Sequence, residues 1–299
     1  MICIQTNHAD TGPKVDYAIP KSLDDAFPIL GAGTHAIVAG GTDFFPSLGD
    51  NPPPENILDV SGIPELQGIT RLDGGWRIGG GVTWTDIIRA PLPPAFDALK
   101  AAAREVGSVQ IQNAGTVAGN ICNASPAADG IPPLLVLDAS VELASRRGMR
   151  KLPLESFVTG VRQVALELDE IVTAVHVPAI AAETRSAFQK LGSRKYLVIS
   201  IAMVAVAINT DEDHRIADIR VAIGACSPVA CRMTSLEDSL VGLRVKTGDD
   251  LPPLEPAHFS CLSPISDMRG SAGYRGVTAS RLARNVILRA LCPETSIHA

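Results

Sequence analysis

The sequence predicts an α+β protein with two domains. With 299 residues, the chain is longer than one minimal core requires. Glycine and proline separate short strand and helix patterns as far as Pro178, and three longer strand patterns follow from Ala187 onward. We therefore expect a first domain over residues 1–180 and a second, smaller α/β domain over residues 181–299.

The composition is that of an ordinary globular protein. Hydrophobic residues make up 46% of the chain and charged residues 19%, which leaves enough apolar surface to form a core. The net charge of -6 disfavours a nucleic-acid partner, because binding to phosphates requires a basic face. No apolar run reaches the ~18 residues of a membrane-spanning helix, and the N-terminal residues do not resemble a secretory signal.

The cysteines are scattered and have neither zinc nor iron–sulfur spacing. They are Cys3, Cys122, Cys226, Cys231, Cys261 and Cys292. Scattered free thiols are typical of a reducing compartment. We therefore expect a cytoplasmic protein with no metal site of its own.

Local patterns predict short elements in the first domain. Ser22 is a favourable N-cap for a helix that reaches Leu30. Residues 107–123 are rich in small side chains and poor in charge, which indicates a long loop. A loop of that length in a compact domain is either functional or wrongly assigned as a loop. A short helix is predicted after Thr83 or Thr85, and longer helices over 94–104 and 127–137. Strands are predicted over 37–39, 56–60, 141–145, 150–154 and 170–177. A hairpin is predicted over 68–79.

The second domain is predicted to contain a three-stranded antiparallel sheet and helices. Its strands are expected over 187–191, 201–209 and 217–224, with a turn over 210–214. A helix over 278–291 would place Leu282, Ala283, Val286, Ile287, Ala290 and Leu291 on one face.

The first candidate binding segment follows the predicted strand Ile37–Ala39. Two adjacent glycines in Gly40–Asp43 can expose consecutive backbone N–H groups, and the missing Cβ atoms let a phosphate approach closely. Thr42 adds a hydroxyl donor. Asp43 would repel phosphate, so it should face a hydroxyl group or cap the next segment. Considered alone, the two glycines are more typical of a tight turn after a strand.

The second candidate segment covers residues 115–129. Small residues alternate there with hydrogen-bonding side chains, and Asp129 could accept from a ribose hydroxyl or from adenine. A glycine-rich loop that ends in a helix capped by Ser125 is the purely structural alternative. Two such segments together favour a dinucleotide, because one can hold each side of a pyrophosphate.

Several other site types are absent from the sequence. No G-x-G-x-x-G opens a helix after a strand, and no G-x-x-x-x-G-K-[ST] is present, so neither a Rossmann site nor a P-loop is predicted. The glycines of Gly79–Trp84 follow a hairpin and are interpreted as structural. No pair of histidines has metal-ligand spacing, and no nucleophile stands beside a base.

These segments resemble the FAD-binding subunits of the molybdenum hydroxylases, the xanthine dehydrogenase family. Gly40–Asp43 resembles their first pyrophosphate loop, and residues 109–138 (VQIQNAGTVAGNICNASPAADGIPPLLVLD) are similar to the family stretch QIRN-x-GT-x-GGN-x-C-N-x-SP-x-AD. The similarity continues at 168–172, 190–194 and 267–275. It covers the chain from about Val15 onward.

The resemblance implies a fold and a set of site residues. The fold would be a two-lobed FAD-binding domain of the PCMH or vanillyl-alcohol-oxidase type, divided near residue 60, followed by the smaller domain. The cofactor would be noncovalent FAD, with Lys190 at its isoalloxazine end. The implied cofactor-binding residues are Ile37, Val38, Ala39, Gly40, Gly41, Thr42, Asp43, Gly115, Thr116, Gly119, Asn120, Cys122, Asn123, Ala128, Asp129, Ile171, Val172, Lys190 and Tyr196.

The resemblance also implies partners and an electron-transfer role. A molybdopterin-binding large subunit would oxidise the substrate, and a small subunit with [2Fe-2S] clusters would relay electrons to the FAD of this chain. NAD or another acceptor would then receive them. Two rivals are a self-contained flavin oxidase, which normally has a larger substrate domain, and a non-catalytic assembly protein that has kept the fold.

Two departures and one basic stretch have open interpretations. Gln112 stands where many relatives have arginine, and Ala118 replaces the first glycine of GGN, which costs little only if its φ stays negative. A run of arginines near the C-terminus predicts either intramolecular pairs on a solvated helix face or contacts with the iron–sulfur subunit. These residues are Arg269, Arg275, Arg281, Arg284 and Arg289.

Overall fold

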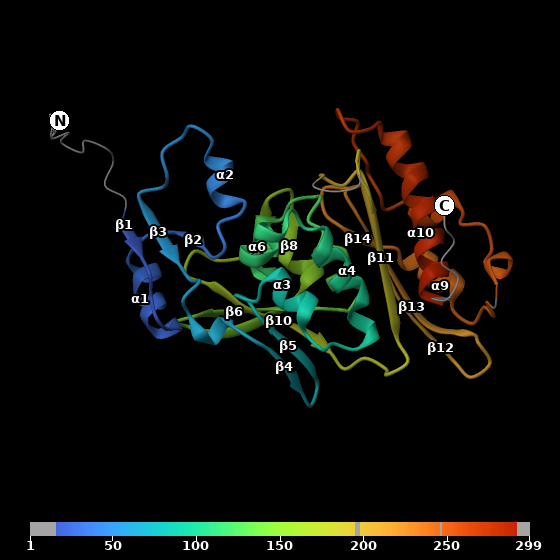
Figure 1. The fold of residues 1–299 in the computed structure, drawn as a ribbon, viewed down its shortest axis with the longest axis horizontal. Helices are drawn as coiled ribbons and strands as arrows, with labels where there is room; N and C mark the ends of the chain where they lie inside the picture. The colour runs from blue at the N-terminus through green and yellow to red at the C-terminus, as the bar shows by residue number, and fades with distance from the viewer. Residues whose placement is uncertain (1–15, 195–197, 246, 292–299) are drawn as a thin grey trace, which may run out of the picture.

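The N-terminal part of the fold is a small lobe built on three parallel strands (Figure 1). The computed structural model describes residues 16–194, 198–245 and 247–291. The lobe contains β1 (Asp16–Ala18), β2 (Ala36–Val38) and β3 (Asn56–Asp59) in the order β1-β3-β2, with helices α1 (Leu23–Ala32) and α2 (Phe44–Leu48). Parallel strands need a crossover, and α1 supplies the one between β1 and β2.

Helix α1 begins where the sequence predicts. The Ser22 hydroxyl accepts from the Asp25 backbone N–H at 3.1 Å, and Asp24 and Asp25 lie in the first turn. Ala26 and Leu30, one turn apart, are buried against β3 and the segment that follows it. This small cluster of apolar side chains forms the core of the first lobe.

The second lobe is built on a five-stranded antiparallel sheet with the order β4-β5-β10-β6-β7. Its strands are β4 (Ile69–Leu72), β5 (Gly75–Gly79), β6 (Ser140–Ser145), β7 (Gly148–Pro153) and β10 (Ile171–Pro178). The predicted hairpin is confirmed by β4 and β5. The other elements are helices α3 (Trp84–Arg89), α4 (Asp97–Glu105), α5 (Val109–Ala114), α6 (Val117–Asn123), α7 (Ile131–Val136) and α8 (Leu154–Phe157), the short strands β8 (Val158–Gly160) and β9 (Gln163–Val164), and the 3-10 helices η1 (Pro64–Leu66) and η2 (Pro94–Phe96).

The prediction of a long loop over 107–123 is wrong, because the segment forms helices α5 and α6. Ser108 and Thr116 cap them, and the Thr116 hydroxyl accepts from the Gly119 N–H at 3.0 Å. Glycine, asparagine and valine have weak helix propensity, but the Thr116 cap and burial of Val117 and Ile121 stabilise the two turns of α6. Tertiary packing therefore overrides the local sequence pattern here.

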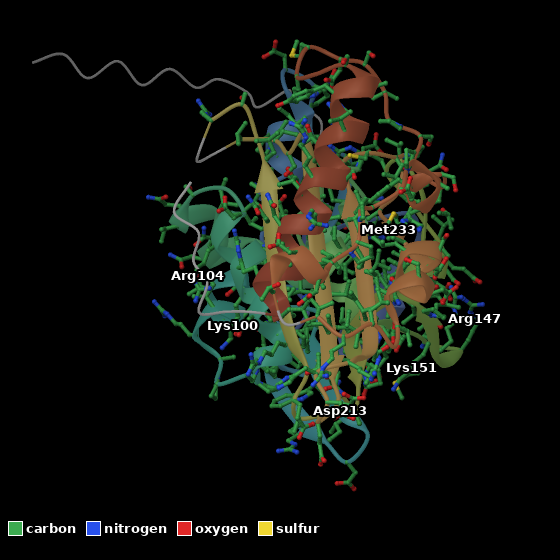
Figure 2. The ribbon with its side chains drawn as sticks, turned by 90° about the vertical axis from the view of Figure 1, so that its right-hand side faces the viewer. Lys100, Arg104, Arg147, Lys151, Asp213 and Met233 are labelled. Atoms are coloured by element: carbon green, nitrogen blue, oxygen red, sulfur yellow. The ribbon has the colours of Figure 1, made fainter. Side chains whose placement is uncertain are left out.

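The second domain contains the three predicted long strands and a short fourth one. The sheet order is β11-β12-β13-β14, all antiparallel. The strands are β11 (Arg185–Leu191), β12 (Ala202–Thr210), β13 (Ile216–Gly224) and β14 (Cys231–Arg232), followed by α9 (Thr234–Leu240), η3 (Gly248–Asp250), η4 (Pro256–Phe259) and α10 (Ala272–Leu291). Figure 2 shows α10 lying across one face of the sheet.

Both faces of the long strands are buried, because successive side chains along β12 point to opposite sides of the sheet. Met203 and Ala205 point into the core shared with α4 and α7, whereas Val204 and Val206 point toward α9 and α10. A strand buried on both faces has a continuous apolar sequence, as β12 does. The sheet of the second domain is thus sandwiched between helices of both domains.

Polar contacts also join the domains at α7. Arg232 donates to a carboxylate oxygen of Asp138 at 2.7 Å and to the Leu135 carbonyl oxygen at 3.3 Å. Arg220 reaches the same carboxylate at 3.1 Å. Cations beside the last carbonyl groups of a helix are electrostatically favourable. Among the described residues, no helix is both long enough and apolar enough to cross a membrane.

Candidate functional site

A cavity of about 640 Å³ lies where the two lobes and the second domain meet. Its volume is in the range of small-molecule and cofactor sites. All residues of Gly40–Asp43 and most of residues 115–129 line it. The lining residues predicted from sequence are Ile37, Val38, Ala39, Gly40, Gly41, Thr42, Asp43, Gly115, Thr116, Gly119, Asn120, Cys122, Asn123, Ala128 and Asp129.

The first glycine loop is shaped by its contacts with the second. A Cβ on Gly40 would stand 1.8 Å from the Ala114 carbonyl oxygen, so the two segments approach through backbone atoms. Gly41 has a φ of +65°, and a Cβ there would meet the Phe45 ring at 2.7 Å. The missing Cβ atoms thus serve the protein's own packing as well as access to the cavity.

Asp43 neither caps α2 with its side chain nor stands alone. Its carboxylate accepts from the Asn123 side chain at 2.6 Å, and Asn123 in turn accepts from the Arg162 guanidinium. Arg162 lies in the turn between β8 and β9, where its φ is 57° and its N–H donates to Ala124 O at 2.9 Å. This chain of polar groups joins three distant segments along the cavity wall.

Asp129 is occupied by protein partners rather than free for a ribose. One of its oxygens accepts from Lys190 Nζ at 2.7 Å and the other from the Ser200 hydroxyl at 2.8 Å. Lys190 also donates to the Glu105 carbonyl oxygen at 3.0 Å. Burial raises the pKa of Asp129, although the Lys190 ammonium favours its charged form.

Lys190 is therefore not a surface charge. Its side chain is only 5% exposed, at the boundary between the cavity and the second domain. Lys190 lies near the end of β11, and Ser200 lies just before β12. Both bind the carboxylate of Asp129, so this one side chain joins the connection between the two strands to the first domain. Val198 and Ile199 of that connection line the cavity.

Cys122 lines the cavity but is not suited to covalent chemistry. Burial raises the pKa of its thiol to about 12, so the thiolate that attacks an electrophile is scarce at neutral pH. This agrees with a site that binds its ligand noncovalently.

Some predicted site residues lie elsewhere. Ile171 and Val172 are 2% and 6% exposed at the start of β10, in the cores of the first and second lobe respectively, and are not among the described residues that line the cavity. Tyr196 lies outside the described residues. Arg162 and Trp84 also line the cavity but were not predicted. Arg162 belongs to no glycine-rich segment, and Trp84 ends the segment Gly79–Trp84, which we interpreted as structural.

The two departures from the family pattern are accommodated by packing. Gln112 is buried, and its side-chain amide donates to the Arg104 carbonyl oxygen at 3.1 Å near the end of α4. Ala118 lies inside α6 and is not among the described residues with positive φ. The condition under which alanine costs little there is met.

Most of the C-terminal arginines make intramolecular contacts. Arg269 and Arg275 both bind Asp267, and the side chain of Arg275 is 4% exposed. Arg284 donates to the carbonyl oxygens of Gly248, Leu251 and Pro252. Of the two interpretations of this stretch, the structure favours intramolecular pairing.

The glycines of Gly79–Trp84 pack closely against neighbouring backbone, as expected of structural glycines, whereas Trp84 lines the cavity. A Cβ on Gly79 would stand 2.2 Å from the Leu66 carbonyl oxygen, and one on Gly80 would stand 2.5 Å from that of Val172. Thr83 caps α3 in a capping box with Asp86. The glycines allow the chain to pass between β10 and the first lobe.

Comparisons with known proteins agree with this geometry. The FAD binding domain in molybdopterin dehydrogenase matches residues 13–180, and the CO dehydrogenase flavoprotein C-terminal domain matches residues 186–290. The putative xanthine dehydrogenase FAD-binding subunit of Escherichia coli K12 is 33% identical over 282 residues, which cover 92% of this chain and 95% of the relative.

Relatives with other names match over nearly their whole length. The carbon monoxide dehydrogenase medium chain of Hydrogenophaga pseudoflava is 29% identical over 279 residues, covering 92% of this chain and 96% of the relative. The solved carbon monoxide dehydrogenase of that organism superposes with a TM-score of 0.84, covering 93% of this chain and 97% of its own chain at 29% identity. The chain therefore belongs to the family of FAD-binding oxidoreductase subunits of the molybdenum hydroxylases.

Proposed function

We propose that this chain holds one FAD noncovalently in the cavity and passes electrons between partner redox centres and an acceptor. The observation that carries the proposal is that two glycine-rich segments, 75 residues apart between Gly40 and Gly115, line one cavity. When bound, FAD supplies two-electron redox chemistry, while the protein supplies binding, orientation and electrostatics.

The residues present are chemically suited to a dinucleotide diphosphate. Thr42 and Thr116 line the cavity and carry hydroxyl groups, and the turn Gly40–Asp43 is of the glycine-rich kind that can present backbone N–H groups to a phosphate. Arg162 is the one cation among the described lining residues, and a guanidinium can bind phosphate oxygens bidentately. We assign the diphosphate to this side of the cavity.

We assign the flavin ring to the end near Lys190. The family resemblance alone puts Ile171 or Val172 near the flavin, since neither lines the cavity. Lys190 supports this assignment through its contacts, because its partner Asp129 and its neighbour Val198 both line the cavity. The proposed division of the chain near residue 180 is supported by the two family matches, which end at residue 180 and begin at residue 186.

A second cavity, of about 420 Å³, supports the proposal that the electron acceptor is an anion such as NAD. It shares Glu105 and Val198 with the FAD cavity, so the two are separated by one wall. Arg194 and Arg289 line it together with one carboxylate, Glu105, whereas the charge of Lys190, which also lines it, is paired with Asp129. A dinucleotide with a negative pyrophosphate would be attracted to such a lining.

The partners we propose are a molybdopterin-binding large subunit and a [2Fe-2S] small subunit. The relatives support this through their names, which describe medium chains and FAD-binding subunits. Large apolar side chains also remain exposed around the start of α10: Ile265, Met268, Tyr274 and Val277. Exposed apolar clusters often mark subunit interfaces.

A flavin spectrum of the purified chain, followed by denaturation, tests the cofactor. We expect FAD in the supernatant, at one per chain. FMN instead, or colour that stays with the precipitate, would contradict noncovalent FAD. A colourless chain that still joins the complex would favour the alternative, a non-catalytic assembly protein.

Assembly and acceptor need separate measurements. Co-expression with the neighbouring subunits should give a stable complex, and a chain that stays monomeric beside them would contradict the partner proposal. Anaerobic NADH should bleach the bound flavin of the complex if NAD is the acceptor. An unbleached flavin that an artificial electron donor still reduces would exclude NAD and leave FAD binding intact.

A further inference from the structure

Trp84 belongs both to the main hydrophobic core and to the wall of the FAD cavity. It is the first residue of α3 and is 1% exposed, yet it is one of the residues that line the cavity. A tryptophan combines a large apolar body with a single donor, the indole N–H. The direction of this donor decides whether Trp84 only packs or also binds the ligand.

Backbone contacts fix Trp84 against the second glycine-rich segment. Its backbone N–H donates to the Gly115 carbonyl oxygen at 3.1 Å, and the preceding Thr83 forms an isolated β-bridge with Thr116. Thr83 also caps α3 in a capping box with Asp86. The indole therefore extends from a backbone position that is held from two directions.

The edge of the indole that carries the N–H runs along this segment. Cδ1 lies 3.5 Å from where a Cβ on Gly115 would stand, and Cζ2 lies 3.1 Å from the corresponding point on Gly130. In an indole ring, Nε1 is located between these two carbons. Thr42 Oγ1 lies 3.2 Å from the same point on Gly115. The N–H edge thus lies beside the place where the first glycine-rich segment approaches the second.

The indole N–H has no acceptor within the part of the chain that the structure describes. In that part, the fully buried side-chain nitrogen and oxygen atoms without a partner are Asn209 Oδ1 and Arg275 Nε. Since the Trp84 nitrogen has no partner and is not one of these, it keeps some accessible surface, and the space that Trp84 lines is the cavity. Asn120 Oδ1, which also lies near Gly130, accepts from the Gly130 N–H at 3.3 Å.

We propose that the Trp84 indole N–H donates a hydrogen bond to a diphosphate oxygen of the bound dinucleotide. The inference rests on the proposed function, because it takes FAD as the ligand and the diphosphate as the group near Thr42 and Thr116. A hydrogen bond to an ionised oxygen is about twice as strong as one between neutral groups. Trp84 is then a binding residue as well as a core residue.

The chemistry of a buried tryptophan supports this role. Buried indole N–H groups usually have a partner, and burying a donor without one costs free energy. The ligand oxygen supplies the missing acceptor when the cavity is filled. An apolar side chain of the same size would pack equally well but would leave that oxygen without this donor.

The test removes the N–H and keeps the shape of the side chain. The analogue 3-benzothienylalanine has sulfur in place of the indole N–H and is introduced at Trp84 of the full chain by stop-codon suppression. We expect the Kd in FAD titrations of the apo chain to rise at least tenfold, which corresponds to about 1.4 kcal/mol. The urea unfolding of the apo chain should match that of the parent, because the volume of the buried side chain is kept.

Trp76 provides the matched control. It is the other tryptophan of the chain, packs against the same core and lies edge-to-face with Phe96 at 5.7 Å. It is not among the described residues that line the cavity. The same replacement at Trp76 should therefore leave the FAD affinity unchanged.

Competition with FAD by ADP, adenosine and riboflavin identifies the group that the N–H binds. The replacement at Trp84 should weaken ADP binding by the same factor as FAD binding. Adenosine and riboflavin have no diphosphate, so their affinities should not change. An unchanged FAD affinity, or a loss of FAD affinity without a loss for ADP, would overturn the inference. A parent chain that binds no FAD would contradict the proposed function itself, on which the inference rests.

Discussion

Single residues decide the shape of the FAD cavity. Gly41 combines a φ of +65° with a Phe45 ring 2.7 Å from where its Cβ would stand. A β-branched residue at positive φ is strained by about 1–3 kcal/mol. We expect Gly41→Val to weaken FAD binding at least about tenfold, or about 1.4 kcal/mol, as measured by FAD titration of the apo chain.

A matched glycine distinguishes loop shape from general damage. Gly31 lies in α1 with nothing within 4 Å of where its Cβ would stand, so Gly31→Ala should bind FAD normally. The far-ultraviolet circular dichroism of both variants should resemble that of the parent. Full flavin occupancy in Gly41→Val would show that this loop does not shape the binding site.

The pair of Asp129 and Lys190 should matter more to stability than a surface ion pair. Lys190→Met leaves a buried carboxylate without its cation, and breaking such a pair costs roughly 3–5 kcal/mol. We expect the free energy of unfolding of the apo chain, measured in urea, to fall by this amount. The double variant Asp129→Asn with Lys190→Met should recover much of it, because no unpaired charge remains.

Lys100→Met is the control for this prediction. Lys100 lies on the partly exposed side of α4 (Figure 2), and surface substitutions usually change stability by less than about 0.5 kcal/mol. If Lys190→Met unfolds at the same urea concentration as Lys100→Met, the pair contributes nothing and our interpretation of it is wrong.

At the scale of elements, α10 depends on the turn that precedes it. Asp267 accepts from Arg275 at 2.7 Å and from the Arg269 backbone N–H at 2.8 Å. Arg275 also donates to the Ile201 carbonyl oxygen at 2.6 Å. The turn therefore joins the first turn of α10 to the segment before β12.

This turn predicts an acid-sensitive second domain. The hydrogen bond from Arg275 lowers the pKa of Asp267 from 3.8 to about 2. A carboxyl whose folded-state pKa is depressed adds stability above its unfolded pKa and loses it as pH falls through the folded value. The melting temperature should therefore fall between about pH 4 and pH 2, and Asp267→Asn should show a shallower fall.

The control is Asp73→Asn in the exposed hairpin turn between β4 and β5. It should keep the full pH dependence of the parent chain. A melting temperature of Asp267→Asn that falls as steeply as that of the parent would assign the acid sensitivity to other carboxylates.

At the scale of the whole molecule, the two domains share a core. Phe188, Met203 and Ala222 of the second domain pack in the same cluster as Leu99 and Leu134 of the first. A ligand held between such parts stabilises both, by about 2.7 kcal/mol when free FAD is 100-fold above its Kd. We expect removal of FAD to lower the melting temperature of the complete chain by several degrees.

Calorimetry with and without added FAD makes this measurement. A single transition that shifts as one unit would show that the domains unfold together. Two transitions, of which only the first responds to FAD, would contradict the shared-core interpretation. FMN serves as the control ligand and should shift the transition less, because it lacks the adenosine half.

The sequence by itself determined the elements whose signals are local. Ser22 predicts the start of α1 through its cap, the alternation around Asp73-Gly74-Gly75 predicts a hairpin, and the spacing of Leu282 to Ala290 predicts the buried face of α10. Two donor-rich glycine segments and their family resemblance also indicated FAD. These signals need only neighbouring residues, so they can be recognised without a fold.

Tertiary structure alone decided what distant residues do together. It turned residues 107–123 into two helices, paired Asp129 with Lys190 instead of leaving it free for a ribose, and brought Arg162 to the cavity. The pairing of Asp129 with Lys190 and the position of Arg162 depend on contacts between residues far apart in the chain, and the two helices depend on burial of Val117 and Ile121 as well as on their caps. The energies of burial and of long-range contacts are absent from any local pattern.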